Sequence, residues 1–376
     1  MIGAFCTTER FEKGGKTMSD KIRFTIDEDL TEAVGTLVSA EKSPISLLRG
    51  SGKPVNDGML TRLRSLGITD ATGKLLGEYQ HAAETLAQTR QFSRLKFSGG
   101  EKIFEFIVYF PSDNSVPVSV VHNGNQLIVQ EPAAFEEAFS LVEQNTGHSI
   151  LASCTFDGKF SPEEAEALFA LLDLERSTLL SRLAEEQEPQ NTTFSPAAVV
   201  KKITGRKEHF QSLEYVIQSR MPPTPPPDQH AVASVLEALA GKGLVVHQGR
   251  QYHLSDALYA LAGRFLIIDN FVVIESGRLD EAGTLWGGSA IVLQAGVNDL
   301  LYIEVHGEEV IVKCITGFEL MDLAGKFMSD PTLVTIPVSA APATPAGEAG
   351  TKTCPKCGAP VKEGKKFCTN CGARIG

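Results

Sequence analysis

No apolar stretch in this sequence of 376 residues is long enough to cross a membrane. The longest runs, such as Phe265–Ile274, contain an Asp and an Asn, and none approaches the roughly 20 apolar residues that a spanning helix needs. The first residues also lack the apolar core of a secretory signal peptide, and residues 1–21 are expected to be a disordered segment or an extension. We therefore predict a cytoplasmic protein that does not contact a membrane.

Cysteine is scarce over most of the chain. Of seven cysteines, four lie in the last 23 residues, and Cys6, Cys154 and Cys314 are scattered singly. An odd, dispersed set without a signal peptide is typical of a reducing compartment. Cys154 and Cys314 lie in apolar, strand-like segments, so we expect each to act as a small buried hydrophobic residue.

Sequence signatures of catalysis are missing as well. The chain has no G-x-x-x-x-G-K-[ST] phosphate loop, no G-x-G-x-x-G after a strand, no G-x-S-x-G and no H-E-x-x-H. His247 and His253 flank a predicted hairpin, VVHQGRQYHL, where exposed histidines are commoner than metal ligands. We therefore predict that the protein is not an enzyme and has no catalytic residues.

The C-terminus, by contrast, carries one specific motif, CPKCGAPVKEGKKFCTNCGARIG. Two C-x2-C pairs can place four thiolates at the corners of a tetrahedron, which leaves no open position for water or substrate, so the metal is structural. A redox dithiol or two disulfides would explain the matched pairs less well. We predict a zinc ribbon over residues 353–376 that holds one zinc ion through Cys354, Cys357, Cys368 and Cys371.

Charge is divided unevenly between this ribbon and the rest of the chain. The formal net charge is −11, and residues 351–376 carry six Lys or Arg against one Glu, or +5, which leaves −16 for the other residues. Zinc with four thiolates adds about −2, so the folded ribbon is only mildly basic. Residues 333–352 contain many Ala, Pro and Gly residues and are predicted to be a flexible linker.

Between the two ends, the same order of predicted elements occurs twice, over residues 22–148 and 149–332. Each copy has a strand-like segment, helices, three strands and a closing helix. The second copy contains an insertion over 184–228, which includes the proline-rich segment MPPTPPPD. The matched segments are Phe24–Asp27 and Cys154–Asp157, helices ending at Gly67 and Gly243, strands Ile103–Phe110, Val116–Val121 and His122–Gln130 against Ser289–Val297, Asp299–Val305 and His306–Cys314, and helices from Ala133 and Phe318.

This order predicts an α+β fold of two pseudo-symmetric copies of an antiparallel sheet flanked by helices, followed by the ribbon. The alternative is that two unrelated segments of helices and strands share a common order by chance. A helix start is clear in the second copy, where Ser161, Pro162 and Glu164 form a capping sequence before an apolar stripe.

The pattern of apolar and turn positions resembles the EspG-type chaperones of actinobacterial type VII secretion. The similarity lies in FSPEEAEALFALLDL (160–174), GLVVHQGRQYHLSDALYALA (243–262) and the strand ending HGEEVIVKC. It spans roughly residues 22–330 and implies a non-catalytic protein that binds a partner chain through a sheet or helical surface. The ribbon, the proline insertion and the linker depart from that family.

A second pattern favours a different function. The segment SVLEALAGKGLVVHQGRQYHLS (234–255) resembles the second half of a winged helix, with a recognition-like helix and a wing hairpin. DNA-binding proteins of this type carry Lys and Arg on both elements, whereas Lys242 and Arg250 are the only cations here. We therefore predict an adaptor or chaperone that binds a protein, and keep a winged-helix and zinc-ribbon regulator that binds nucleic acid as the alternative.

Overall fold

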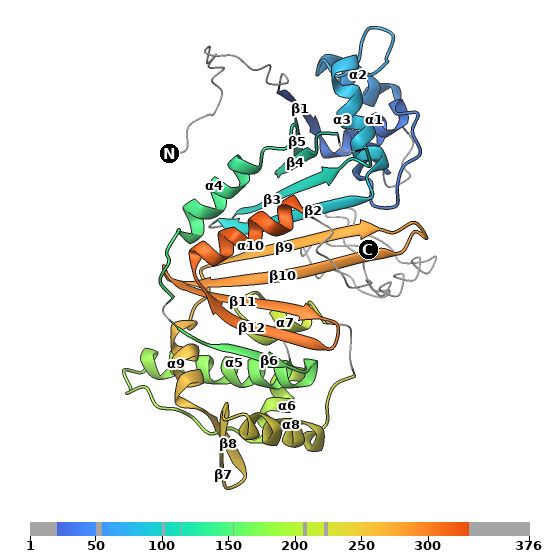
Figure 1. Ribbon diagram of the computed structural model, residues 1–376. Coiled ribbons are helices and arrows are strands. Elements are labelled where there is room, and N and C mark those ends of the chain that lie inside the picture. Colours follow the sequence, from blue (N-terminus) through green and yellow to red (C-terminus); the bar gives the residue numbers. More distant parts are fainter. Residues whose placement is uncertain are drawn as a thin grey trace, which may run out of the picture.

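Ten strands of the chain join edge to edge in one antiparallel sheet (Figure 1). The computed structural model describes residues 21–49, 55–99, 102–113, 115–152, 154–205, 209–221 and 225–330. The predicted linker and zinc ribbon, with all four ribbon cysteines, lie outside these ranges. The strands of the sheet are β1 (Ile22–Asp27), β2 (Gln91–Gly99), β3 (Lys102–Phe110), β4 (Val118–Asn123), β5 (Gln126–Glu131), β6 (Asp157–Phe160), β9 (Asn270–Leu279), β10 (Leu285–Ala295), β11 (Asp299–His306) and β12 (Glu309–Ile315).

Strands β2 and β9 form the middle of this sheet and are antiparallel to each other. Outward from this pair the order is β3, β4, β5 and β1 on one side and β10, β11, β12 and β6 on the other. The α+β class is confirmed, but the strands expected as two copies of a sheet form a single sheet. Neither β2 nor β9 is among the predicted strands, although together they join the two halves.

One face of the sheet is covered by α4 (Phe135–Thr146) and α10 (Gly317–Ser329), which lie side by side in front of it in Figure 1. Alternation along the central strands points Leu95, Phe97, Val272 and Ile274 toward these helices. The helices were expected from Ala133 and Phe318, and α10 begins at a capping box made by Thr316 and Glu319.

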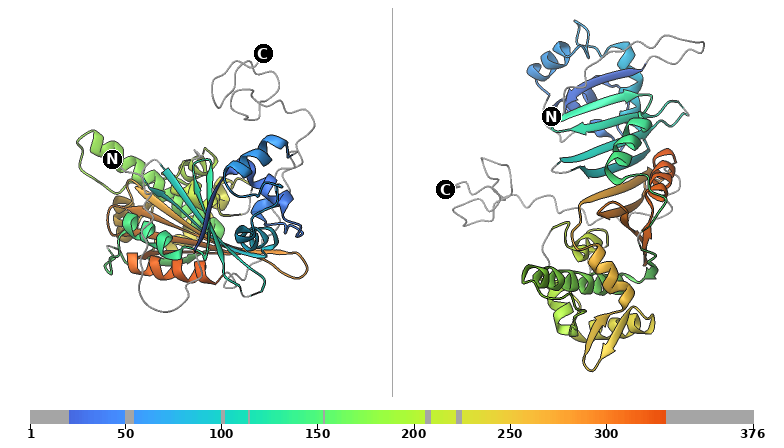
Figure 2. Two further views of the ribbon diagram at one scale, coloured as in Figure 1. Left: turned by 90° about the horizontal axis from the view of Figure 1, so that it is seen from above. Right: turned by 90° about the vertical axis from the view of Figure 1, so that its left-hand side faces the viewer.

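Two separate groups of helices cover the ends of the opposite face (Figure 2, right). Ile107 and Tyr109 of β3 pack into the first group, whereas Val273 of β9 and Ile291 of β10 pack into the second. The first group is α1 (Thr31–Leu37), α2 (Asp57–Ser65) and α3 (Gly77–Gln88); the second is α5 (Pro162–Ala184), α6 (Pro196–Thr204), α7 (Leu213–Gln218), α8 (Gln229–Gly241) and α9 (Asp256–Arg264), with the hairpin β7 (Val245–Gln248) and β8 (Gln251–Leu254).

Several local predictions are confirmed. Gly67 and Gly243 follow the ends of α2 and α8 with φ of 69° and 72°, a conformation that glycine adopts without strain. The capping box of Ser161 and Glu164 begins α5. The predicted hairpin VVHQGRQYHL is β7–β8.

The strand expected over Cys154–Asp157 is misplaced, because β6 begins at Asp157. Its register pairs Phe160 with Val310 of β12, and Phe160 is buried whereas Thr155 is exposed. The burial of Phe160 therefore sets the position of the strand, directly before the N-cap of α5.

Cys154 and Cys314, which are separated by 160 positions in the sequence, form a disulfide. The prediction of two separate buried cysteines is wrong, because the segment before β6 runs alongside β12 and brings the two sulfurs together. Disulfides of this kind persist in oxidising compartments, so a reducing cytoplasm remains only a prediction. Within the described ranges, no helix is both long and apolar enough to span a bilayer.

Candidate functional site

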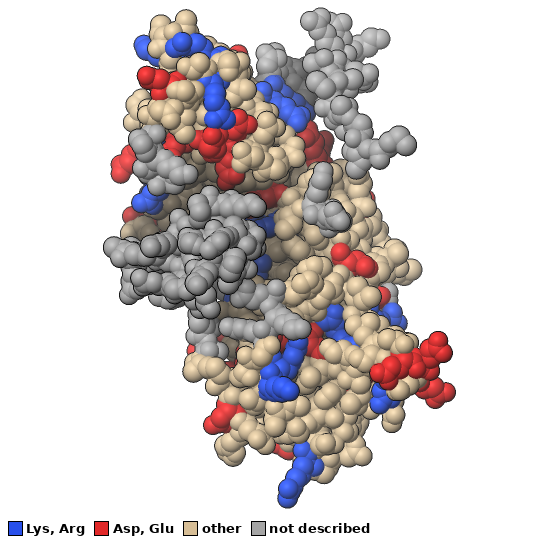
Figure 3. Space-filling view, turned by 180° about the vertical axis from the view of Figure 1, so that it is seen from behind, with Lys and Arg blue, Asp and Glu red and all other residues tan. Residues whose placement is uncertain are grey.

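On the face that carries the two helix groups, no described helix covers the middle of the sheet. Figure 3 shows a hollow between the two helical lobes, with Lys and Arg on its floor. Strand alternation places polar side chains of β2, β3, β4, β9 and β10 there. We call this surface the sheet groove and define it by Arg94, Lys96, Glu105, His122, Glu275 and Ser289, together with Arg220, which follows α7.

Ion pairs cross the groove from strand to strand. Arg94 on β2 contacts Glu105 of β3 and Glu275 of β9, each at 3.1 Å. The other oxygen of Glu275 lies 2.7 Å from Arg220, whose guanidinium also donates to Ser289 Oγ at 2.9 Å. Both oxygens of Glu275 are thus paired with arginines, whereas the second oxygen of Glu105 lies 3.7 Å from His122 Nδ1. These pairs link the two halves of the chain.

The groove has more hydrogen-bond donors than acceptors. Lys96 has no ion pair or hydrogen bond within the described part of the chain, although it lies directly opposite Glu105. Arg94 Nε, Arg220 Nε and His122 Nε2 are buried and have no hydrogen-bond partner among the described residues, but they are out of direct reach of a partner. The half-buried Lys96 is accessible, so this surface is suited to a partner that brings a carbonyl or carboxylate oxygen to it.

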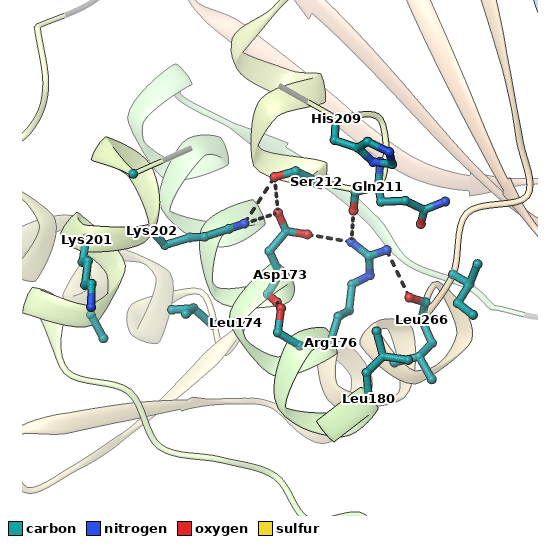
Figure 4. A pocket seen from close by; sticks show the side chains of 14 residues that line it. Asp173, Leu174, Arg176, Leu180, Lys201, Lys202, His209, Gln211, Ser212 and Leu266 are labelled. Carbon is teal, nitrogen blue, oxygen red and sulfur yellow. Dashed lines mark hydrogen bonds and ion pairs between the residues drawn. The ribbon is translucent and has the colours of Figure 1, made fainter. Parts of the chain in front are cut away.

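A second candidate site is a pocket between α5, α6 and the segment before α7 (Figure 4). One wall is a buried ion pair in which Arg176 donates to Asp173 Oδ1 at 2.6 Å. Asp173 also accepts from Lys202 at 3.1 Å, from Ser212 Oγ at 2.8 Å and from the backbone of Leu213 at 3.1 Å. Burial lowers the pKa of Arg176, and the charge of Asp173 opposes that shift.

The hydrogen-bond donors of Arg176 are also occupied. Its guanidinium donates to the carbonyl oxygens of Phe265, Gln211 and Leu266 at 2.6, 2.7 and 3.2 Å. The pair therefore clamps α5 to three other segments, and it has no free oxygen with which to take a proton from a substrate. This part of the pocket is structural, and sequence spacing gave no sign of it beyond the i, i+3 pair itself.

Another cluster has the order of a nucleophile, a base and an acid. His81 Nδ1 lies 2.7 Å from Glu131, and its Nε2 lies 3.0 Å from Ser115 Oγ. The hydroxyl, however, lies closer to Asp113, at 2.6 Å. Because its single hydrogen points to Asp113, Ser115 has none to give to His81, and the cluster ties the β3–β4 loop to α3.

The wing-like hairpin carries little positive charge. Phe194 forms an isolated antiparallel bridge with Tyr252 of β8. Lys242 is held by Glu164 at 2.6 Å, which leaves Arg250 at the hairpin turn. His247 stacks on Tyr252, and His253 contacts Asn191; within the described residues, no three His, Cys, Asp or Glu side chains could hold a metal ion together.

Comparison with known proteins identifies one segment. A family model of the zinc-ribbon domain matches residues 353–375, the region that contains the two C-x2-C pairs. The match supports zinc binding at the C-terminus, as the sequence predicts. No curated protein matches the chain.

Proposed function

We propose that this protein is a non-catalytic adaptor whose sheet groove binds a partner protein and whose zinc ribbon adds a second contact. The observation that carries the proposal is the groove itself: a strip of sheet between two helical lobes that no described helix covers, on which Lys96 lacks an acceptor among the described residues. A surface of this kind gains most from a partner that supplies the missing acceptor.

The body, in this proposal, is a duplicated unit related to EspG-type chaperones. The strand order outward from β2 and β9 supports the duplication, because chain order and position match on both sides; the relation to EspG-type chaperones depends on the sequence pattern alone. The ends of α2 and α8 also match: Ile68 donates to Leu63 O and Leu244 to Leu239 O, at 3.0 and 3.1 Å. The insertion over 184–228 then accounts for α6 and α7, which have no counterpart in the first half of the described chain.

The ribbon, in this proposal, holds one structural zinc ion through Cys354, Cys357, Cys368 and Cys371. Four thiolates in two C-x2-C pairs fit the tetrahedral preference of zinc, and metal binding supplies the folding energy of so short a segment. Because the linker is long, the ribbon and the groove can engage two parts of one partner. Two linked weak contacts raise avidity through effective concentration.

Affinity capture with three baits tests the adaptor function: the full chain, a chain ending at residue 330, and the full chain with Lys96→Glu. Relative to the full chain, the truncation should weaken capture of a specific protein about tenfold or more. Lys96→Glu in the full chain should also weaken capture, because it reverses a charge in the groove. Lys74→Glu, an exposed charge reversal outside the groove, should capture as the wild type does. Failure of every bait, or equal capture by the Lys96→Glu and Lys74→Glu forms, contradicts the proposal.

The alternative function, nucleic-acid binding through the wing and the ribbon, makes a different prediction. Binding would weaken steeply with salt, because release of counterions from phosphates drives it. The bridge between Phe194 and Tyr252 favours a winged-helix shape. The ion pair between Lys242 and Glu164, however, leaves little positive charge on the wing for contact with phosphates.

A further inference from the structure

The proposed adaptor function does not involve the pocket of Figure 4, whose lining combines apolar and cationic side chains. Its volume is about 940 Å³, within the range of pockets that enclose small molecules. Five of its 14 lining residues are apolar and come from three segments: Leu174, Leu180, Ala198, Leu266 and Ile267. Leu180 and Ile267 are 41% and 57% exposed, so apolar surface reaches the mouth.

The polar groups with remaining capacity are all donors. Lys202 Nζ has three hydrogens, and its contacts are Asp173 at 3.1 Å and Ser212 at 3.3 Å, which leaves one hydrogen for a ligand. His209 Nδ1 accepts from the backbone of Gln211 at 3.1 Å, so the neutral ring carries its hydrogen on Nε2. Lys201 is exposed and has no ion pair or hydrogen bond with any described residue.

The acidic group of the pocket does not cancel this charge. Asp173 is already paired with both Arg176 and Lys202, and the ring of His209 is the only other titratable group that lines the described pocket besides Lys201. One carboxylate therefore faces three cations, Arg176, Lys201 and Lys202, beside apolar walls. An anionic head group with an apolar body is complementary to both features.

We infer that this pocket binds a small carboxylate with an apolar tail, of the class of a medium-chain fatty acid. The carboxylate binds the remaining hydrogens of Lys202 and His209, while Lys201, which points away from them in Figure 4, attracts it by charge alone. The tail lies along Leu174, Leu266 and Ile267. The pocket holds the ligand without converting it, because Asp173 and Arg176 are saturated by structural bonds. This site is distinct from the sheet groove and does not depend on the adaptor function.

Binding of octanoate to the full-length protein tests the inference, by titration calorimetry below the micelle concentration of octanoate. Octanoate should bind, whereas octanol, which lacks the charge, and acetate, which lacks the tail, should each bind at least about fivefold more weakly. Lys201→Glu should weaken octanoate binding about fivefold, as expected for reversal of one exposed charge. Ile267→Asp should weaken it about tenfold, because it removes apolar contact and adds repulsion.

Arg250→Glu is the matched control, since it reverses an exposed charge on the β7–β8 turn, and it should bind octanoate as the wild type does. All three substitutions are at exposed positions, and equal melting temperatures would verify that each variant is folded. The inference is overturned if octanoate does not bind, if octanol binds as tightly, or if Lys201→Glu and Ile267→Asp leave the affinity unchanged.

Discussion

Phe92 on β2 lies directly opposite Gly277 on β9, and its ring occupies the space in which a side chain at position 277 would begin. A Cβ atom at 277 would lie 2.5 Å from Phe92 Cε1, well inside van der Waals contact. The Phe92 ring also contacts Arg94, whose guanidinium lies over the ring at 5.8 Å from its centre. This fit sits at the strand pair that joins the two halves of the sheet.

We expect Gly277→Ala to lower the free energy of unfolding by about 1–3 kcal/mol, the usual cost of overpacking. Urea denaturation followed by circular dichroism would measure it. Gly325→Ala in α10 is the control, because a Cβ at position 325 would meet no atom within 4 Å. This substitution should leave the stability unchanged or raise it. Adding Phe92→Leu should recover part of the loss; no recovery would place the strain elsewhere.

Asp173→Ala should be among the most destabilising single substitutions of the body. It would leave Arg176 and Lys202 without their shared carboxylate, and removing one partner of a buried ion pair costs about 3–5 kcal/mol. The comparison is Asp322→Ala, which breaks the exposed pair with Lys326 on α10 and should change stability by about 0.5 kcal/mol at most. Equal effects of the two in denaturant titrations would contradict a structural role for the clamp.

Glu175 gives stability a dependence on pH. It is fully buried, one carboxylate oxygen accepts from Thr192 N at 3.1 Å, and the other has no partner in the described chain. Burial raises the pKa of Glu175, and the hydrogen bond from Thr192 only partly offsets the rise. A raised pKa means that the folded state holds the proton more tightly, so this group favours folding at low pH and disfavours it once pH exceeds the folded pKa.

Glu175→Gln should therefore raise the free energy of unfolding at pH 7, and the gain should shrink as pH falls toward the ordinary carboxyl range. Denaturant titrations of wild type and variant at several pH values would measure the difference. Glu308→Gln, at an exposed turn, should show no such trend. A gain that is constant with pH would mean that the amide simply packs better than the carboxyl group.

The sequence predicts local structure better than long-range structure. Capping residues and turn glycines act within a few positions, so the start of α5 and the ends of α2 and α8 could be read directly. Strand β2, in contrast, alternates Phe92, Arg94 and Lys96 with Leu95 and Phe97, and its charged face resembles a solvated segment unless the groove is known. Strand β2 was missed for this reason.

The candidate sites depend on residues that are far apart in the chain. Arg94 and Glu275 are separated by 181 positions, and Asp173 and Ser212 by 39, so no short motif could reveal them. The zinc ribbon is the opposite case, because all four of its cysteines lie within one short segment. Sequence reasoning therefore found the ribbon and could not find the groove or the pocket.

The disulfide between Cys154 and Cys314 should stabilise the second half of the body. It closes a loop of 160 positions, and loss of a native disulfide typically costs about 2–4 kcal/mol. The double substitution Cys154→Ser with Cys314→Ser should lower stability by about this amount and abolish any effect of mild reductant. Cys6→Ser should respond to reductant as the wild type does, and a wild type that is insensitive to reductant would show that the two thiols remain free.

Zinc should be bound at one ion per chain and should depend on the ribbon cysteines alone. Cys354→Ser with Cys357→Ser removes two of four thiolates, so metal analysis of the purified variant should find almost no zinc, whereas Cys6→Ser should keep one ion. The ligands must be deprotonated to bind, so acidification should release zinc before the body unfolds. Because residues 333–352 are predicted to be a linker between ribbon and body, removal of zinc by a chelator should leave the melting temperature of the body unchanged. Zinc retained in the double variant would place the metal outside the two C-x2-C pairs and contradict the assigned ligands.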